Sequence, residues 1–391
     1  MNEGQELFRM NTKTTKHRAR KWWIALAIFF GLILILLLAG YMVFHHYFSM
    51  MQQGEESMEI LDSIPEEPED FPPEASLPEE SGEDSEESKE NGEESKENGE
   101  ESNGSSGSGL QQREGMKNWT SYAGKVYQDP DTYNILLVGM DSREGDMRSR
   151  SDTMIVASIN KKTQKIVLTS IMRDTYVDIP EVGGNRINAA TAYGGINLLV
   201  RTIESNFNIH IDNYMVTDFF TFADAVDLMG GIDLQISAAE AESMNNYIKE
   251  YNRLTGETEG FMEIKDGLVH VNGKQALSYC RVRNVGYSDF QRTERQRTVL
   301  LKLADKAKGM GIGDINRIAE AILPQLVTNL SQTDCLSLLW DALTQYKNYK
   351  IETFRIPADG TYQNVYIRKM AVLKIDFKKN IEMFFEKAYN R

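Results

Sequence analysis

The feature that most constrains this chain is an uncharged apolar run at residues 22–44, with the sequence WWIALAIFFGLILILLLAGYMVF. At about 1.5 Å per residue, a helix of this length spans roughly 35 Å, enough to cross the hydrocarbon core of a bilayer. A cleaved signal peptide would have a shorter apolar region that ends in small residues, whereas Tyr41 to Phe44 follow here. The run therefore predicts one retained transmembrane helix over residues 22–44, and it excludes a soluble cytosolic enzyme.

The charges that flank this run predict its orientation. The preceding residues are rich in Lys and Arg, namely Arg9, Lys13, Lys16, Arg18, Arg20 and Lys21. The positive-inside rule places such a flank in the cytoplasm. We therefore expect residues 1–21 to form a cytoplasmic basic tail. The rest of the chain would lie outside, in a single-pass protein of the cell membrane with an extracellular C-terminal domain.

Acidic residues are concentrated in one segment. The chain has a formal charge of −15, yet residues 51–110 alone hold 21 Asp and Glu against 2 Lys. This segment contains the repeated sequence EESKENG, which has no apolar position and so cannot form a coiled coil. A segment so polar does not bury enough apolar surface to fold. We predict a disordered, acidic Glu/Ser/Gly-rich tether over residues 45–121, either a spacer that lifts a domain off the membrane or a filler of no defined length.

The remaining residues, 122–391, are expected to form one α/β domain. Residues 111–391 are neutral overall, which disfavours binding to nucleic acid. Three successive apolar segments predict an antiparallel meander of strands, at residues 133–138, 153–159 and 165–171. Helical patterns follow, one of them over residues 314–327, with further short strands between them. The pattern favours a three-layer sandwich with a central mixed sheet flanked by helices.

Charged residues gather where the first strands are expected to end. Asp141 follows the first strand, Arg150 and Asp152 begin the second, and Arg173 follows the third. Carboxylates are the hard oxygen ligands that Mg²⁺ prefers, and guanidinium groups fit phosphate oxygens. Together they indicate a magnesium–pyrophosphate site. The alternative is surface pairing of Asp with Arg.

The second half of the chain adds further candidates. Arg281 and Arg283 are separated by one residue, and Asp289 opens a predicted helix on which Arg292 and Gln296 share a face. The N-terminus of a helix attracts anions. The alternative is an exposed helix with internal ion pairs. No P-loop, HExxH or CxxC motif is present, and the two cysteines, Cys280 and Cys335, do not form a disulfide scaffold.

The order of these motifs resembles the LytR-CpsA-Psr (LCP) family of cell-envelope glycopolymer transferases. The resemblance extends from about Tyr133 to Ala304. The sequences that carry it are NILLVG with Asp141 and Arg143, RSDTM at 150–154, RDTYV at 173–177, RINAA at 186–190, AYGG at 192–195, GGID at 230–233, NGKQAL at 272–277, RVR at 281–283 and DFQRTERQ at 289–296. Met172 stands where the family usually has Pro.

The resemblance implies a function that the residue patterns alone do not specify. LCP proteins are membrane-anchored phosphotransferases that move an anionic glycopolymer, such as wall teichoic acid or capsular polysaccharide, from a polyprenyl-pyrophosphate carrier to peptidoglycan. Carried over to this chain, Asp141 and Asp152 would hold Mg²⁺, and Arg150, Arg173, Arg281 and Arg283 would bind the pyrophosphate. Asp289, Arg292 and Gln296 would complete the polar mouth of the site.

The chemistry implied is attack of an acceptor hydroxyl on the phosphorus next to the sugar. Arg173 would stabilise the transferred group, and Asp141 or Asp289 would remove the hydroxyl proton. A pyrophosphatase that uses water as acceptor is the alternative with the same site. A transcriptional attenuator is disfavoured, because the predicted topology places the domain outside the cell and the neutral domain has no basic stripe.

Overall fold

The structure is a computed structural model that describes residues 40–46, 48–53, 60–61, 125–141, 148–286 and 289–391. The predicted cytoplasmic tail and most of the predicted transmembrane helix lie outside these ranges. The end of the apolar run, residues 40–44, is helical. Within the described ranges, no helix is both long enough and apolar enough to cross a bilayer.

The centre of the domain is a mixed, seven-stranded sheet in the order β1-β10-β7-β2-β3-β4-β11. Its strands are β1 (Gln52–Gln53), β2 (Thr132–Met140), β3 (Ser151–Asn160), β4 (Lys165–Ile171), β7 (Asn213–Asp218), β10 (Val327–Thr328) and β11 (Lys350–Ile356). Strands β2, β3 and β4 form the predicted antiparallel meander. β7 runs parallel to β2, and β11 runs parallel to β4, so the mixed sheet is confirmed.

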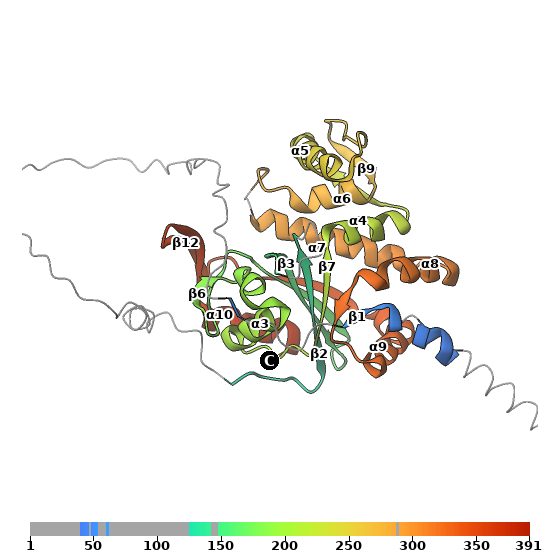
Figure 1. The fold of residues 1–391 in the computed structure, drawn as a ribbon. Coiled ribbons are helices and arrows are strands. Elements are labelled where there is room, and N and C mark those ends of the chain that lie inside the picture. The colour runs from blue at the N-terminus through green and yellow to red at the C-terminus, as the bar shows by residue number, and fades with distance from the viewer. Residues whose placement is uncertain (1–39, 47, 54–59, 62–124, 142–147, 287–288) are drawn as a thin grey trace, which may run out of the picture.

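Both faces of this sheet are covered by helices (Figure 1). The alternation of β2 sends Leu136, Val138 and Met140 into the main core, where they meet α3 (Ala189–Phe207) and α10 (Phe377–Phe384). Tyr133 and Ile135 point to the opposite face and pack in a smaller cluster with Leu338 of α9 (Gln332–Thr344). Side chains of β2 alternate between the two faces of the sheet, and both faces are apolar. Helices therefore pack on both faces, which gives three layers.

A second group of elements lies beyond one end of the sheet, in the upper part of Figure 1. It comprises α4 (Phe219–Leu228), β8 (Ile232–Ile236), α5 (Ala238–Thr255), β9 (Gly267–Val271), α6 (Gly273–Arg281), α7 (Asp289–Ala307) and α8 (Ile312–Ile322). Most of these elements share their own apolar core, which includes Leu234, Met244 and Val299. Capping boxes at Ser237 and Asn272 define where α5 and α6 begin, because each satisfies two backbone N–H groups.

Two hairpins complete the domain. β5 (Tyr176–Ile179) pairs with β6 (Gly183–Arg186), and β12 (Tyr362–Ile367) pairs with β13 (Met370–Ile375). The two hairpins meet where the N–H of Leu373 donates to the carbonyl oxygen of Asp174, 2.9 Å away. This contact fixes the turn that follows β4.

The start of the predicted tether differs from the expectation. Residues 52–53 form β1 at the edge of the sheet, and Leu61 donates a backbone hydrogen bond to Tyr193. Pairing with a distant strand supplies contacts that local composition does not reveal. Most of the predicted tether, residues 62–121 in particular, lies outside the described ranges, and its disorder stays a prediction.

Candidate functional site

The candidate site lies at the edge of the sheet where β2 and β4 end and β3 begins. Met140 is paired with Ser151, and Ile155 is paired with Ser170, so the first residues of β3 lie beside the last residues of its neighbours. Asp152 is therefore adjacent to the turn that holds Arg173. The N-terminus of α7 approaches the same edge and brings Asp289 to it.

Arg173 joins the acidic residues of this edge. Its Nη1 donates to Oδ1 of Asp152 over 2.9 Å, and its Nε donates to Oδ2 of Asp289 over 3.3 Å. The same Nε lies 3.7 Å from Oδ2 of Asp174. One guanidinium thus links the start of β3, the turn after β4 and the start of α7.

Two arginines from the second half of the chain approach the same carboxylates. Nη2 of Arg283 lies 3.3 Å from Oδ2 of Asp152, and its Nε lies 3.6 Å from Oδ1 of Asp289. Arg292, one turn into α7, places Nε 3.3 Å from Oδ1 of Asp289 and Nη1 3.8 Å from Oδ2 of Asp152. Arg292 is 2% exposed, whereas the side chain of Arg283 is 32% exposed. Of these arginines, Arg283 is therefore the one that a ligand from solvent reaches most easily.

Two further charged residues lie beside these side chains, Asp174 and Arg186, and the sequence predicted no role for them. Oδ1 of Asp174 lies 3.6 Å from Nε of Arg186, which also donates to the carbonyl oxygen of Ala371. Both residues belong to sequences that carried the family resemblance, and Asp174 follows Arg173 directly. That adjacency was the available signal, because a tight turn brings neighbouring side chains to one place.

Together these residues form what we call the arginine–aspartate cluster. Its members are Asp152, Arg173, Asp174, Arg186, Arg283, Asp289 and Arg292. With four guanidinium groups and three carboxylates it has one positive charge in excess. A partly buried site with this balance attracts an anion, because buried charges interact through a low dielectric.

The surroundings of the three carboxylates separate their pKa values. Burial alone would raise the pKa of Asp152, but Arg173, Arg292 and Arg283 hold it well below its usual range. The pKa of Asp289 is likewise held low by Arg292, its hydrogen bond with Asp174, and Arg173, against the effect of burial. Burial, with the hydrogen bond to Asp289 and its negative charge, raises the pKa of Asp174 to about 7. Such a divergence is typical of sites that transfer protons.

Asp141 and Arg150 lie at the same edge. The backbone N–H of Asp141 donates to the carbonyl oxygen of Arg150 over 3.4 Å, and Arg150 precedes Asp152 by two residues. Their backbones therefore border the arginine–aspartate cluster. Their predicted roles, magnesium ligand and pyrophosphate ligand, stay predictions.

The contacts of Arg281 and Gln296 are made with residues outside the cluster. Nη2 of Arg281 lies 3.0 Å from Oε2 of Glu250, and its guanidinium lies over the rings of Phe219 and Tyr247 at 5.1 and 4.8 Å. Gln296 is buried, and its Nε2 lies 3.5 Å from the carbonyl oxygen of Cys280. The predicted pyrophosphate role of both residues stays a prediction.

The carboxylates of this edge suit a magnesium ion only where a substrate supplies further oxygen ligands. Oδ1 of Asp174 and Oδ1 of Asp289 are buried and accept no hydrogen bond among the described residues, although the guanidinium groups of Arg186 and Arg292 lie 3.6 and 3.3 Å away. In that part of the chain, no group of three or more His, Cys, Asp or Glu side chains is arranged to hold a metal ion unaided. Magnesium is commonly bound by one or two carboxylates together with phosphate oxygens and water. An ion at this edge would therefore need oxygen ligands from the substrate.

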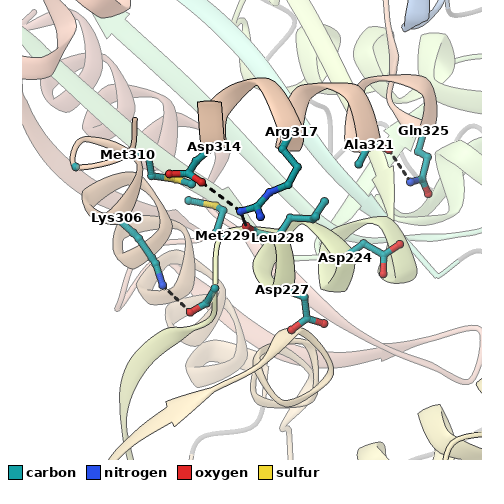
Figure 2. Close-up of a pocket in the computed structure, with 12 residues that line it drawn as sticks. Asp224, Asp227, Leu228, Met229, Lys306, Met310, Asp314, Arg317, Ala321 and Gln325 are labelled. Atoms are coloured by element: carbon teal, nitrogen blue, oxygen red, sulfur yellow. Dashed lines mark hydrogen bonds and ion pairs between the residues drawn. The ribbon is translucent and has the colours of Figure 1, made fainter. Parts of the chain in front are cut away.

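A separate cavity of about 910 Å³ lies between the ends of α4 and α7 and the side of α8 (Figure 2). Its two basic side chains already bind backbone oxygens. Nζ of Lys306 donates to the carbonyl oxygens of Gly230 and Gly231, and Arg317 donates to that of Leu228. Because Asp224 and Asp227 also line it, this cavity is a poor site for pyrophosphate.

Comparison with protein families gives one match over most of the chain. The model of the LytR_cpsA_psr family matches residues 82–383. The chain belongs to the LytR_cpsA_psr family. The family membership predicted from the motifs between Tyr133 and Ala304 is thus confirmed. The match also includes the C-terminal part of the domain, where the motifs gave little guidance.

Two curated members of the LytR_cpsA_psr family show the extent of the similarity. The polyisoprenyl-teichoic acid–peptidoglycan teichoic acid transferase TagU of Oceanobacillus iheyensis is 33% identical over 246 residues, which cover 60% of this chain and 70% of TagU. The transferase TagT of Bacillus subtilis is 31% identical over 213 residues, which cover 53% of this chain and 63% of TagT.

Solved structures of the LytR_cpsA_psr family have the same fold. The crystal structure of B. subtilis TagT superposes with a TM-score of 0.51 at 25% identity, over 70% of this chain and 96% of TagT. A structure described as TagT bound to LI-WTA superposes with a TM-score of 0.53, also at 25% identity and over the same shares. The mixed sheet between helical layers is therefore the family fold.

Proposed function

We propose that this protein is a phosphotransferase that moves an anionic glycopolymer, wall teichoic acid or capsular polysaccharide, from a polyprenyl-pyrophosphate carrier to peptidoglycan. The observation that supports this most strongly is the arginine–aspartate cluster, whose excess positive charge suits a pyrophosphate. The similarity to TagU and TagT, which are described as teichoic acid transferases, supports the same reaction.

In the proposed reaction, a hydroxyl of peptidoglycan attacks the phosphorus next to the sugar. A new P–O bond forms to the acceptor, the P–O bond to the carrier breaks, and polyprenyl phosphate leaves with its negative charge. Arg173 and Arg283 would bind the phosphoryl oxygens. Their contacts with the carboxylates of Asp152 and Asp289 hold both guanidinium groups in place at the site. Preorganised guanidinium groups stabilise charge that develops on such oxygens.

The hydroxyl proton must pass to a base, and the three carboxylates of the cluster differ in this capacity. Asp152 and Asp289 have pKa values held well below their usual range, so they are weak bases at neutral pH. Asp174 has a pKa raised to about 7 by burial and by Asp289. A general base works best when its pKa is near the operating pH. We therefore assign the proton to Asp174 rather than to Asp141 or Asp289, the two candidates from the sequence.

Replacing Asp174 with asparagine should flatten the pH profile of transfer. In the native protein, kcat/KM should rise as the pH passes through about 7, because Asp174 accepts a proton only when ionised. The variant should be less active and should lack this rise. The measurement is kcat/KM between about pH 5.5 and 8.5. A variant that keeps both the activity and the rise would contradict the assignment.

The stability of the two proteins gives a second readout. The carboxyl group of Asp174 has a higher pKa in the folded chain than in the unfolded chain, so its protonated form stabilises the folded state. This contribution is complete at pH values below the unfolded pKa, and it is lost as the pH rises through about 7. The native protein should therefore lose stability towards pH 8. The Asp174→Asn variant should lose less, because its amide does not titrate.

We also propose that the site uses Mg²⁺, held by Asp141 and Asp152 with oxygens of the substrate. The ion would neutralise charge on the pyrophosphate and polarise its phosphoryl oxygens. Asp152 also forms ion pairs with Arg173 and Arg283, so replacing it would change the cluster as well as the proposed metal site. Asp141 is therefore the better residue with which to test the metal.

Replacing Asp141 with asparagine should shift the magnesium requirement of transfer to higher concentration. The amide keeps the shape of the carboxylate but removes a charged ligand. The measurement is the transfer rate against magnesium concentration for the native protein and for Asp141→Asn and Asp152→Asn. The Asp152 variant should also be less stable, because Arg173, Arg283 and Arg292 each lose one of their carboxylate partners and keep only the others. Native activity that survives chelation would contradict the role of magnesium.

We further propose that the apolar run at residues 22–44 anchors the protein in the cell membrane, with the N-terminus in the cytoplasm and the domain outside. This topology would bring the domain to both a membrane-borne carrier and the cell wall. Protease added to wall-stripped cells should then remove the domain. Protection of the domain until the cells are lysed would reverse the orientation.

The reaction is tested with the purified full-length chain and a lipid-linked glycopolymer, with and without peptidoglycan oligomer. Transfer predicts a polymer–peptidoglycan product that forms only when the oligomer is present. Release of free polymer at the same rate in both conditions would instead indicate a pyrophosphatase that uses water as acceptor.

A further inference from the structure

The residues that follow the apolar run are attached directly to the domain. Residues 40–46 and 48–50 are helical, and β1 then pairs in parallel with β10 at the edge of the central sheet. Only residues 45–51 separate β1 from the end of the apolar run, and a stretch of this length spans at most roughly 25 Å. The sheet edge therefore lies close to the end of the proposed membrane helix.

The register of the sheet relates the outermost strand, β1, to the candidate site at the strand ends. Gln52 pairs with Val327, which lies in one row with Val216, Val138 and Met154 across the next three strands. Met154 is two residues beyond Asp152. Since neighbouring strands are about 4.8 Å apart, four steps along this row cover roughly 19 Å. The edge strand β1 thus lies level with the arginine–aspartate cluster.

A second attachment follows at residues 60–61. The N–H of Leu61 donates to the carbonyl oxygen of Tyr193 over 2.9 Å, and Ile60 packs against the main core. Gly195 has a φ of +68°, which kinks α3 at this point. A Cβ at Gly194 would lie 2.8 Å from Cδ2 of Leu198 and 3.2 Å from Cγ1 of Ile60, so the glycine lets both side chains approach the backbone here.

The far end of the acidic segment returns to the same helix. The N–H of Tyr127 donates to the carbonyl oxygen of Asn208, which caps the C-terminal end of α3. Tyr193 lies in the first part of α3, just before its kink, and Asn208 lies at its C-terminal end. Both ends of the acidic segment therefore lie on one helix of the domain.

We propose that residues 48–53 and 60–61 form a docking segment that fixes the domain against the membrane, and that the attachments of Leu61 and Tyr127 to α3 hold both flanks of the acidic segment on the domain. This inference rests on the membrane topology proposed above. It replaces the spacer expected from the sequence, because the length of a segment attached at both ends to one body cannot set the distance of that body from the membrane. The height of the arginine–aspartate cluster above the bilayer would then be constant.

The first experiment measures that height by energy transfer. The full chain is reconstituted in nanodiscs containing acceptor-labelled lipid, with a donor dye at Gln363→Cys, an exposed position, in a Cys335→Ser background. Cys280 is buried and should not react. Deleting residues 75–114 should leave the transfer efficiency unchanged. A flexible spacer shortened in this way would bring the dye closer by roughly 15 Å, and such a change would overturn the proposal.

The second experiment measures amide hydrogen exchange of residues 48–61 in the same nanodiscs. Ile60→Asp should raise the exchange rate of the Leu61 amide by about tenfold or more, because a charged side chain cannot pack against the apolar core as Ile60 does. Leu61→Asp is the matched control. Its side chain is 38% exposed, and it keeps the backbone donor, so exchange should change little.

Fast exchange throughout residues 48–61 of the native chain would also overturn the proposal, as would equal effects of the two variants. Neither experiment uses transferase activity. A chain that docks as described but transfers no polymer would therefore refute the proposed reaction and leave the docking segment intact. A chain that does not enter the nanodisc would refute the membrane topology, and with it this inference.

Discussion

Replacing Arg292 with methionine should lower the free energy of unfolding by about 3–5 kcal/mol at neutral pH, which is the cost expected when one partner of a buried ion pair is removed. Arg292 is almost fully buried and lies between the carboxylates of Asp289 and Asp152. Its Nη2 also donates to the backbone carbonyl oxygen of Asp152. Methionine fills similar space but leaves both carboxylates with less positive charge beside them. The measurement is equilibrium unfolding by urea.

The pH dependence identifies the cause of this loss. Arg292 helps to hold the pKa values of Asp152 and Asp289 below their usual range. A lowered pKa stabilises the folded state above the unfolded pKa, and this contribution is lost as the pH falls through the native pKa. The methionine variant lacks part of this contribution, so its deficit should be largest at neutral pH and should shrink towards pH 3.

An exposed arginine provides the control. Arg317 lies 3.3 Å from Asp314 one turn away on α8, and both side chains are more than half exposed. Surface pairs of this kind contribute less than about 1 kcal/mol, so Arg317→Met should change stability little. Equal losses in the two variants, or a loss at Arg292 that does not depend on pH, would show that the ion pairs of the cluster are not its cause.

The strands at the start of the domain were predictable because they are local. β2, β3 and β4 are consecutive, apolar and joined by short connections, and their order in the sheet follows from their order in the chain. The prediction of one helix over residues 314–327 was wrong at its end. α8 ends at Ile322, Pro324 follows in a short 3₁₀ turn, and Val327–Thr328 form β10. A proline favours such an ending, but the partner of β10 is β7, more than a hundred residues earlier.

The hairpin of β12 and β13 shows why other elements were missed. Its turn contains Arg368 and Lys369, both with positive φ, at 50° and 67°. Tight hairpin turns with positive φ usually contain Asn-Gly or Asp-Gly, which is the signal that sequence analysis relies on. Here that signal is missing, and the pairing is visible only in the folded chain.

Within the candidate site, the sequence predicted five members of the arginine–aspartate cluster. They are Asp152, Arg173, Arg283, Asp289 and Arg292. Arg281 differs because it is the last residue of α6, whereas Val282, with a ψ of 123°, already leaves the helix. Arg283 follows beyond the end of the helix, and from there its side chain contacts Asp152 and Asp289. The raised pKa of Asp174 depends on burial beside Asp289, and no local pattern reveals that contact.

Replacing Arg283 with alanine should reduce the rate of glycopolymer transfer by roughly 10- to 150-fold, because a charge-assisted hydrogen bond to a phosphate contributes about 1.5–3 kcal/mol. Arg283 contacts Asp152 and Asp289 and is the most exposed arginine of the cluster. Arg283→Lys should also be slow, since an ammonium group lacks the planar fork of a guanidinium. The measurement is kcat/KM with lipid-linked polymer and peptidoglycan oligomer.

Arg281 is the matched control, because it is the same residue type two positions earlier and the sequence predicted the same role for it. Its partners are Glu250 and two aromatic rings, outside the arginine–aspartate cluster. Arg281→Ala should therefore retain most of the transfer rate while losing some thermal stability. If both alanine variants lose activity equally, pyrophosphate contacts extend to the surface between α4 and α5. If only Arg281→Ala loses activity, the cluster is a structural network and the substrate binds elsewhere.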